Sequence, residues 1–202
     1  MIPFLVTFFI WSALHSLMAS LPFKKRVIKV AGERTYDGLY RLFYNIIATI
    51  TFIPVFYLGI SLLPNRVIWR LPYPINLLFL AIQIGAVIGL VFSLLYTDLL
   101  RFAGIGQFIR FLRGDEIINP TPQFMINGPY RFIRHPLYLC GLVFLWFTPV
   151  MTLSILVINL AFSLYFWIGS IIEEERLEVV FGDSYREYQQ QVPRLFPIKL
   201  TS

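Results

Sequence analysis

Two clusters of polar side chains interrupt the apolar C-terminal half of this sequence. The first is the run Arg-His-Pro-Leu-Tyr at 134–138, and the second is three consecutive glutamates at 173–175. Pro136 is well placed as the first residue of a helix, because the backbone N–H that proline lacks would have no partner there. His135 would then be the N-cap. The free N–H groups and the dipole of such a helix end attract an anion.

The glutamates add the complementary chemistry. Carboxylates accept hydrogen bonds from ribose hydroxyls and from ammonium groups. If the uncharged stretch 136–172 folds back as a hairpin, its two ends meet at one face of a membrane. The helix start and the carboxylates would then be neighbours. Together they could hold a ligand that carries a carboxylate, an ammonium group and a ribose.

Four stretches without Asp, Glu, Lys or Arg define the elements that position these clusters. Since about 20 apolar residues of helix cross a hydrocarbon core, each stretch is long enough to span a membrane. In the last stretch, Pro149 is expected to break the helix and leave a short arm and a full arm. We therefore expect an all-α, polytopic integral membrane protein with about five transmembrane helices and a C-terminal helical hairpin. The expected spans lie near 2–21, 42–63, 75–97, 137–149 and 151–172.

Composition supports this class and excludes others. The chain is 57% hydrophobic and 14% charged, whereas soluble proteins are about 25% charged. This excludes an ordinary soluble domain, a disordered chain and a DNA-binding domain, despite the net charge of +6. A single cysteine, Cys140, excludes an intrachain disulfide. With two histidines and no Cys/His cluster, we expect no metal site.

The basic residues predict an orientation. Fifteen of the 17 lie in the two long loops and the C-terminal tail, and two, Arg66 and Arg70, lie between the second and third spans. Cytoplasmic loops carry the excess of Lys and Arg, so this bias predicts an outside N-terminus and a cytoplasmic C-terminus. The first segment has no basic residue before its apolar run, and we interpret it as a retained helix rather than a signal peptide.

The polar segments complete the expected organisation. Apolar residues at helical spacing between 102 and 112 predict a cytoplasmic helix in the membrane interface. The tail is expected to continue the last helix, break near Gly182 and form a short helix over 185–192. We also expect the tail to help bind the ligand, as a cofactor, at the two polar clusters. We interpret 1–202 as a single domain, with three spans in 1–97 and a catalytic half in 98–202.

In this arrangement the chain resembles a family of membrane methyltransferases. The run at 134–138, the apolar stretch and Glu174-Glu175 resemble an RHPxY–hydrophobic–EE pattern. Isoprenylcysteine carboxyl methyltransferases, phospholipid methyltransferases and some sterol reductases share that pattern. The tail at 181–188 is similar to the ending of that family. Cys140 stands where many members have a glycine.

Other stretches resemble one branch more closely. Residues 14–19, 97–99 with 104–107, and 146–152 are similar to the NnrU-type branch, which includes bacterial methanethiol S-methyltransferases. The resemblance implies S-adenosylmethionine as cofactor. It implies cofactor-binding roles for Tyr130, His135, Pro136, Tyr138, Glu174 and Glu175, with Arg134 and Tyr138 as catalytic candidates.

Each of these residues also has a purely structural interpretation. Arg134 and His135 could anchor a helix start, and the tyrosines could be interfacial aromatics. Glu173 is expected to be a solvated helix end. Arg194 is either an ordinary tail charge or a contact of cofactor or substrate.

His15 is the one ionisable residue inside the first span. Such residues usually face a cavity or a partner. His15 is therefore either satisfied by a neighbouring helix or a polar group of the substrate pocket, and it is our third catalytic candidate.

We expect direct methyl transfer to a small or lipophilic thiol, through orientation and desolvation of the nucleophile. The expected partners are that acceptor and membrane lipid, and not nucleic acid; the oligomeric state stays open. One alternative is carboxyl O-methylation of an isoprenylcysteine or another lipid-like acceptor. Others are an NADPH-dependent enzyme of the sterol-reductase type and a non-enzymatic NnrU-type membrane protein.

Overall fold

The computed structural model describes residues 1–62, 64–97, 99–115 and 126–196. Most of these residues are helical. The chain divides into two compact units, Met1–Leu63 with Thr97–Gln123, and Pro64–Tyr96 with Phe124–Ser202. We call them unit 1 and unit 2. The expected division of the chain into three spans in 1–97 and a catalytic half in 98–202 stays a prediction, because it concerns function rather than compact units.

Unit 1 is built on one long helix. Ser20 separates α1 from α2 and caps α2 by accepting a hydrogen bond from the Phe23 N–H. Trp11 donates from its indole to the Ala48 carbonyl and so ties α1 to α3. The helices of the unit are α1 (Ile2–Ala19), α2 (Leu21–Ala31), α3 (Glu33–Ser61), α5 (Leu99–Ala103) and α6 (Ile105–Arg113). The predicted helix between 102 and 112 is confirmed from Ile105 onward as α6, but Gly104 separates it from α5, which contains Phe102. Its place in a membrane interface stays a prediction.

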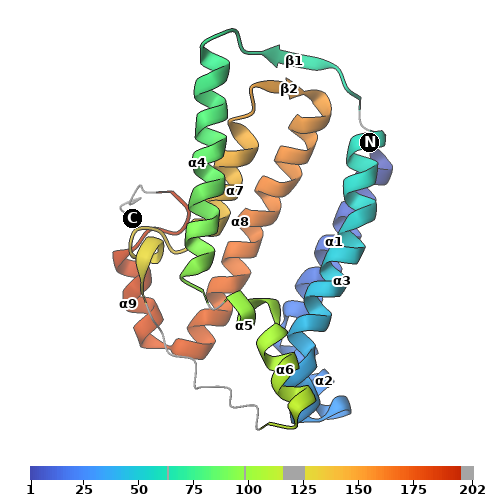
Figure 1. The fold of residues 1–202 in the computed structure, drawn as a ribbon, viewed down its shortest axis with the longest axis vertical. Coiled ribbons are helices and arrows are strands. Elements are labelled where there is room, and N and C mark those ends of the chain that lie inside the picture. Colours follow the sequence, from blue (N-terminus) through green and yellow to red (C-terminus); the bar gives the residue numbers. More distant parts are fainter. Residues whose placement is uncertain (63, 98, 116–125, 197–202) are drawn as a thin grey trace. The chain divides into compact units, whose positions relative to one another are not determined.

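Unit 2 carries both polar clusters. In Figure 1 its helices α4, α7 and α8 run side by side, with two strands at one end and α9 near the other. Its elements are β1 (Val67–Arg70), α4 (Ile75–Leu95), the 3-10 helix η1 (Gly128–Arg131), α7 (Pro136–Trp146), β2 (Val150–Thr152), α8 (Leu153–Phe181) and α9 (Asp183–Gln191).

Four described helices, α1, α3, α4 and α8, are long and apolar enough to cross a membrane, and α7 is a shorter apolar helix. This is the composition of a polytopic membrane protein. The predicted count of five spans stays a prediction. One helix is longer than expected, since α3 begins at Glu33 rather than near 42. A charged residue ends an apolar stretch without ending a helix, which explains this difference. α8 continues past its apolar stretch to Phe181, as expected for the start of the tail.

The hairpin of α7 and α8 is asymmetric, as expected from Pro149. The 11 residues of α7 extend about 16 Å, whereas α8 has 29 residues. Polar side chains of the neighbouring helices satisfy carbonyls at the end of α7. Gln83 of α4 donates to the Phe144 carbonyl at 2.8 Å, and Asn159 of α8 donates to the Leu145 carbonyl at 2.7 Å. Backbone groups at membrane depth need such partners, because lipid supplies none.

The expectation of a purely helical chain is wrong in one detail. β1 and β2 form an antiparallel pair, with Val67 opposite Thr152 and Arg70 opposite Val150. The chain leaving α7 is extended here, and β1 supplies hydrogen-bond partners for it. Two strands of four and three residues, about 80 positions apart, leave no periodic signal in the sequence.

The tail folds as predicted in outline. Gly182, with a φ of +57°, ends α8, and α9 begins at Asp183. Tyr185, Tyr188 and Val192 are buried together, and Leu177 is among the residues that pack against them. The short C-terminal helix is therefore confirmed, two residues earlier than expected, and it packs back against the end of α8.

Candidate functional site

The start of α7 has the predicted geometry. His135 is its N-cap and Pro136 its first residue. The chain just before the helix is fastened to the tail, since the N–H groups of Arg134 and His135 donate to the carbonyls of Pro193 and Arg194 at 3.0 and 3.1 Å. Main-chain bonds thus join two segments that are about 60 residues apart.

Glu174 is the centre of the polar cluster. Arg134 binds its carboxylate through two nitrogens, Nε to Oε1 at 2.7 Å and Nη2 to Oε2 at 3.1 Å. The His135 Nε2 lies 3.1 Å from the same Oε1. The Glu174 side chain is only 7% exposed, so its charge is buried together with that of Arg134. A buried carboxylate is tolerated when it is paired and hydrogen-bonded in this way.

The tail completes this pairing. The Arg134 Nη1 donates to the carbonyls of Gln189 and Val192 at 2.7 and 2.9 Å. Gln189 also donates to the Glu174 Oε2 at 3.3 Å and to Glu178 at 2.8 Å. The start of α7, the end of α8 and α9 therefore form one hydrogen-bonded cluster. In this structure the anion beside the α7 start is the protein's own carboxylate.

Glu173 occupies the accessible edge of the cluster. The Tyr138 hydroxyl donates to its Oε2 at 2.9 Å, and the His135 Nδ1 lies 3.7 Å from the same oxygen. Arg176 lies 3.9 Å from the other oxygen, and the Glu173 side chain is 35% exposed. The rings of His135 and Tyr138 are stacked, and Tyr138 stacks in turn on Phe166.

The two outer glutamates have different surroundings. Glu173 was expected to be a solvated helix end, but it contacts Tyr138. Glu175 is exposed, and its expected role at the cofactor stays a prediction. Because the helix turns by about 100° per residue, neither Glu173 nor Glu175 points in the same direction as Glu174.

Tyr130 extends the accessible edge from η1. Burial and the negative charge of Glu173 raise the pKa of Tyr130 to about 12. Its phenol is therefore neutral, and a hydrogen-bond donor, at physiological pH. The Tyr188 hydroxyl donates to the Tyr130 carbonyl and fixes η1 on α9.

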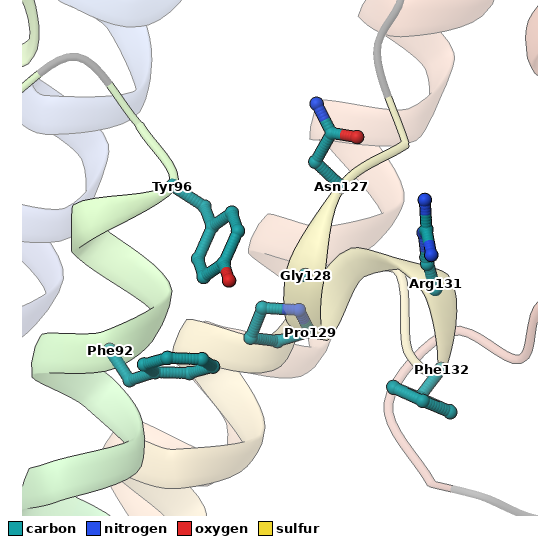
Figure 2. A pocket seen from close by; sticks show the side chains of 7 residues that line it. All are labelled: Phe92, Tyr96, Asn127, Gly128, Pro129, Arg131 and Phe132. Carbon is teal, nitrogen blue, oxygen red and sulfur yellow. The ribbon is translucent and has the colours of Figure 1, made fainter.

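A groove of about 610 Å³ lies between the end of α4 and η1. Figure 2 shows the rings of Phe92 and Tyr96 on the α4 side, facing Pro129. Arg131 and Asn127 are among the residues that give it polar atoms. Tyr130 is absent from its lining, so the groove and the glutamate cluster use different residues of η1.

Six of the eight predicted site residues, all except His15 and Glu175, lie in or beside this cluster of unit 2. Arg134 and His135 contact Glu174, and Pro136 begins α7. Tyr138 donates to Glu173, and Tyr130 lies near the same carboxylate.

His15 belongs to unit 1. Its Nε2 lies 2.6 Å from the Tyr44 hydroxyl, and its ring is 5.5 Å from that of Trp11. These contacts fit a histidine satisfied by a neighbouring helix. Its catalytic role stays a prediction.

Sequence reasoning missed Gln189 and Arg176 as members of the cluster. A signal for Gln189 exists in the spacing of α9: Tyr185, Tyr188 and Val192 mark one helix face, and Gln189 lies on that face.

Comparison with known proteins gives a family for this arrangement. The family model for phospholipid methyltransferase matches residues 81–184, which include both polar clusters. Methanethiol S-methyltransferase 1 of Bradyrhizobium diazoefficiens is 29% identical over 91% of this chain and 62% of its own length. A methanethiol S-methyltransferase of Crocosphaera subtropica is 28% identical over 93% of this chain and 71% of its own length.

A more distant relative has another acceptor in its name. The protein-S-isoprenylcysteine O-methyltransferase of Schizosaccharomyces pombe is 30% identical over 55% of this chain and 53% of its own length. No solved structure matches the chain.

Proposed function

Since the chain belongs to the phospholipid methyltransferase family, we propose that it is a membrane methyltransferase that transfers a methyl group from S-adenosylmethionine to a small or lipophilic thiol. The observation that carries the proposal is the cluster around Glu174. It holds the start of α7 and the end of α8 together and leaves the carboxylate of Glu173 partly exposed beside Tyr138.

The donor set fits the polar groups of this cofactor. Glu173 offers an accessible carboxylate to an ammonium group or to ribose hydroxyls. Tyr130, held as a neutral phenol, offers a hydroxyl at the same edge. Glu174 and Arg134 bind each other and the tail, so we assign them to shaping the site rather than to direct contact.

When bound, S-adenosylmethionine supplies an electrophilic methyl group. The chain contributes orientation and a site from which water is excluded. Tyr138 orients the Glu173 carboxylate, and the stack of His135, Tyr138 and Phe166 holds the Tyr138 ring.

The thiol acceptor is supported by the two relatives that match over nine-tenths of this chain, since both are named methanethiol S-methyltransferases. The chain is shorter than either of them, so we extend their acceptor to it as part of the proposal. We also propose that the N-terminus is outside and that the glutamate cluster faces the cytoplasm, from which the cofactor would enter.

The test is a transfer assay on membranes that contain the chain. With labelled S-adenosylmethionine and methanethiol, we expect a labelled volatile thioether that membranes without the chain do not form. Absence of a labelled thioether with methanethiol and with longer alkyl thiols would contradict the proposed acceptor.

Carboxyl O-methylation is the second candidate, because of the isoprenylcysteine relative. It predicts a labelled methyl ester on a prenylcysteine, which base hydrolyses, whereas the thioether resists base. The two products therefore separate the candidates in one assay.

A further inference from the structure

Arg194 is held in the cluster on two sides. Its carbonyl accepts the His135 N–H at 3.1 Å, and its neighbours Val192 and Leu195 are buried. Its Nε lies 3.6 Å from the Glu174 Oε2, and its guanidinium carbon lies 5.5 Å from the centre of the Trp167 ring. The side chain therefore has a defined position rather than that of a free tail charge.

One nitrogen of this guanidinium makes no hydrogen bond to the described residues. The Arg194 Nη1 is buried and has no hydrogen-bond partner among the residues that the structure describes. A buried donor without an acceptor costs about 1–3 kcal/mol. Glu174 does not satisfy it, because that carboxylate already binds Arg134, His135 and Gln189.

The surroundings of Nη1 indicate which kind of acceptor would meet it. Trp167 precedes Glu174 by seven residues, which is two helical turns or about 10 Å along α8. Arg194 thus extends from the carboxylates toward the apolar part of α8. An acceptor that comes from the bilayer would approach from this apolar side.

A thiol on that apolar side would ionise less readily than in water, and a nearby cation would reverse this effect. The thiolate is the nucleophile, and burial in apolar surroundings raises the pKa of a thiol. Arginine keeps its charge at all relevant pH values, and an opposite charge nearby favours the ionised form.

We infer that Arg194 is a catalytic residue that holds the acceptor sulfur as a thiolate; this rests on the proposed thiol methylation. The S–H bond breaks, the proton passes to bulk water, and the electron pair stays on sulfur, where Nη1 donates to it. That pair forms the new S–CH3 bond as the methyl–sulfonium bond breaks and the cofactor becomes a neutral sulfide.

The variant that tests this is Arg194→Met, which keeps an unbranched stem against Trp167 but removes the charge. The probe is thiophenol, whose thiolate has its own ultraviolet band, titrated in the presence of purified protein and S-adenosylhomocysteine. We expect the pKa of bound thiophenol to be about one unit higher in Arg194→Met than in the parent, since a nearby opposite charge shifts a pKa by about 1–3 units. Arg194→Lys should keep part of the effect.

Activity should follow the same order. Below the pKa of thiophenol, kcat/KM of Arg194→Met should be about tenfold lower than that of the parent, and the difference should shrink above it. Arg186→Met is the matched control, because Arg186 is an exposed tail arginine paired with Asp183. It should leave both the pKa and the pH profile unchanged.

Two results would overturn the inference. If Arg194→Met binds S-adenosylhomocysteine tenfold more weakly while the pKa of bound thiophenol stays the same, the arginine holds the cofactor instead. If only the melting temperature falls, its role is structural. If the parent itself forms no thioether from any thiol, the proposed function fails, and that outcome is separate from either result.

Discussion

Successive residues of an α-helix point about 100° apart, so Glu173, Glu174 and Glu175 have three different surroundings. Glu174 is buried against Arg134, Glu173 is partly exposed beside Tyr138, and Glu175 is exposed. A buried, fully paired carboxylate holds the structure together. A partly exposed carboxylate can still accept hydrogen bonds from a ligand.

Glu173→Gln should therefore weaken the binding of S-adenosylhomocysteine, and Glu175→Gln should not. Glutamine keeps the volume of the side chain but removes the charge. Hydrogen bonds to charged groups contribute about 1.5–3 kcal/mol, and the lower end, which suits a partly exposed group, corresponds to about a tenfold loss of affinity. Calorimetric titration of each purified variant measures the dissociation constants.

Glu175→Gln is the matched control, because it makes the same substitution one residue away. Equal affinity of Glu173→Gln and the parent would remove Glu173 from the site. Glu174→Gln is unsuitable for this comparison, since it leaves the buried charge of Arg134 without its partner, and such losses cost several kcal/mol of stability.

The sequence predicts some of these residues for a clear physical reason. Pro136 predicts a helix start, and with it the N-cap position of His135, because proline fits that place and few others in a helix. Which two glutamates face the cluster could not be predicted, since it depends on the rotation of α8 about its axis. In the folded protein that rotation places Glu173 and Phe166 of α8 against Tyr138 of α7.

At the scale of elements, η1 depends on a close approach to α4. Gly128 has a φ of +56°, and a Cβ atom there would lie 2.7 Å from the Tyr96 ring. The short helix that carries Tyr130 and one wall of the groove therefore needs glycine at this position, for both backbone and space (Figure 2).

Gly128→Ala should destabilise unit 2 and displace η1. A left-handed backbone costs a residue with a Cβ about 1–2 kcal/mol, and the contact with Tyr96 adds overpacking of about 1–3 kcal/mol. We expect a lower melting temperature in detergent, measured by intrinsic tryptophan fluorescence during heating.

Gly85→Ala, in the middle of α4, provides the comparison. A Cβ atom at Gly85 meets nothing within 4 Å, and alanine favours a helix. It should melt no lower than the parent. If Gly128→Ala melts at the parent's temperature, the tight contact with Tyr96 does not exist in the folded protein.

The long apolar helices could be predicted, because an uncharged stretch of about 20 apolar residues is typical of a transmembrane helix. The pairing of β1 with β2 could not, since it depends on where the chain leaves α7. Gln83 and Asn159 gave an unused signal: an amide in an otherwise apolar helix indicates a backbone group that needs a partner.

At the scale of the whole molecule, the distribution of basic residues is the main sign of orientation. The loop that contains β1 carries Arg66 and Arg70, and the remaining 15 basic residues lie in the polar segments that follow the first and third apolar stretches and in the tail. A cytoplasmic tail would place the glutamate cluster on the side where a water-soluble cofactor is available, so the proposed function depends on this orientation.

Cysteine labelling of cells that produce the chain tests this orientation. The natural thiol is first removed with Cys140→Ala, and single cysteines are then introduced as Lys25→Cys in α2, Asn65→Cys before β1 and Arg186→Cys in α9. All three positions are exposed. Because positive loops stay in the cytoplasm, a membrane-impermeant maleimide should label only Asn65→Cys in intact cells, and all three after the membrane is opened.

Labelling of Arg186→Cys in intact cells would put α9 and the glutamate cluster outside. Labelling of Lys25→Cys and Asn65→Cys from the same side would mean that α3 does not cross the membrane.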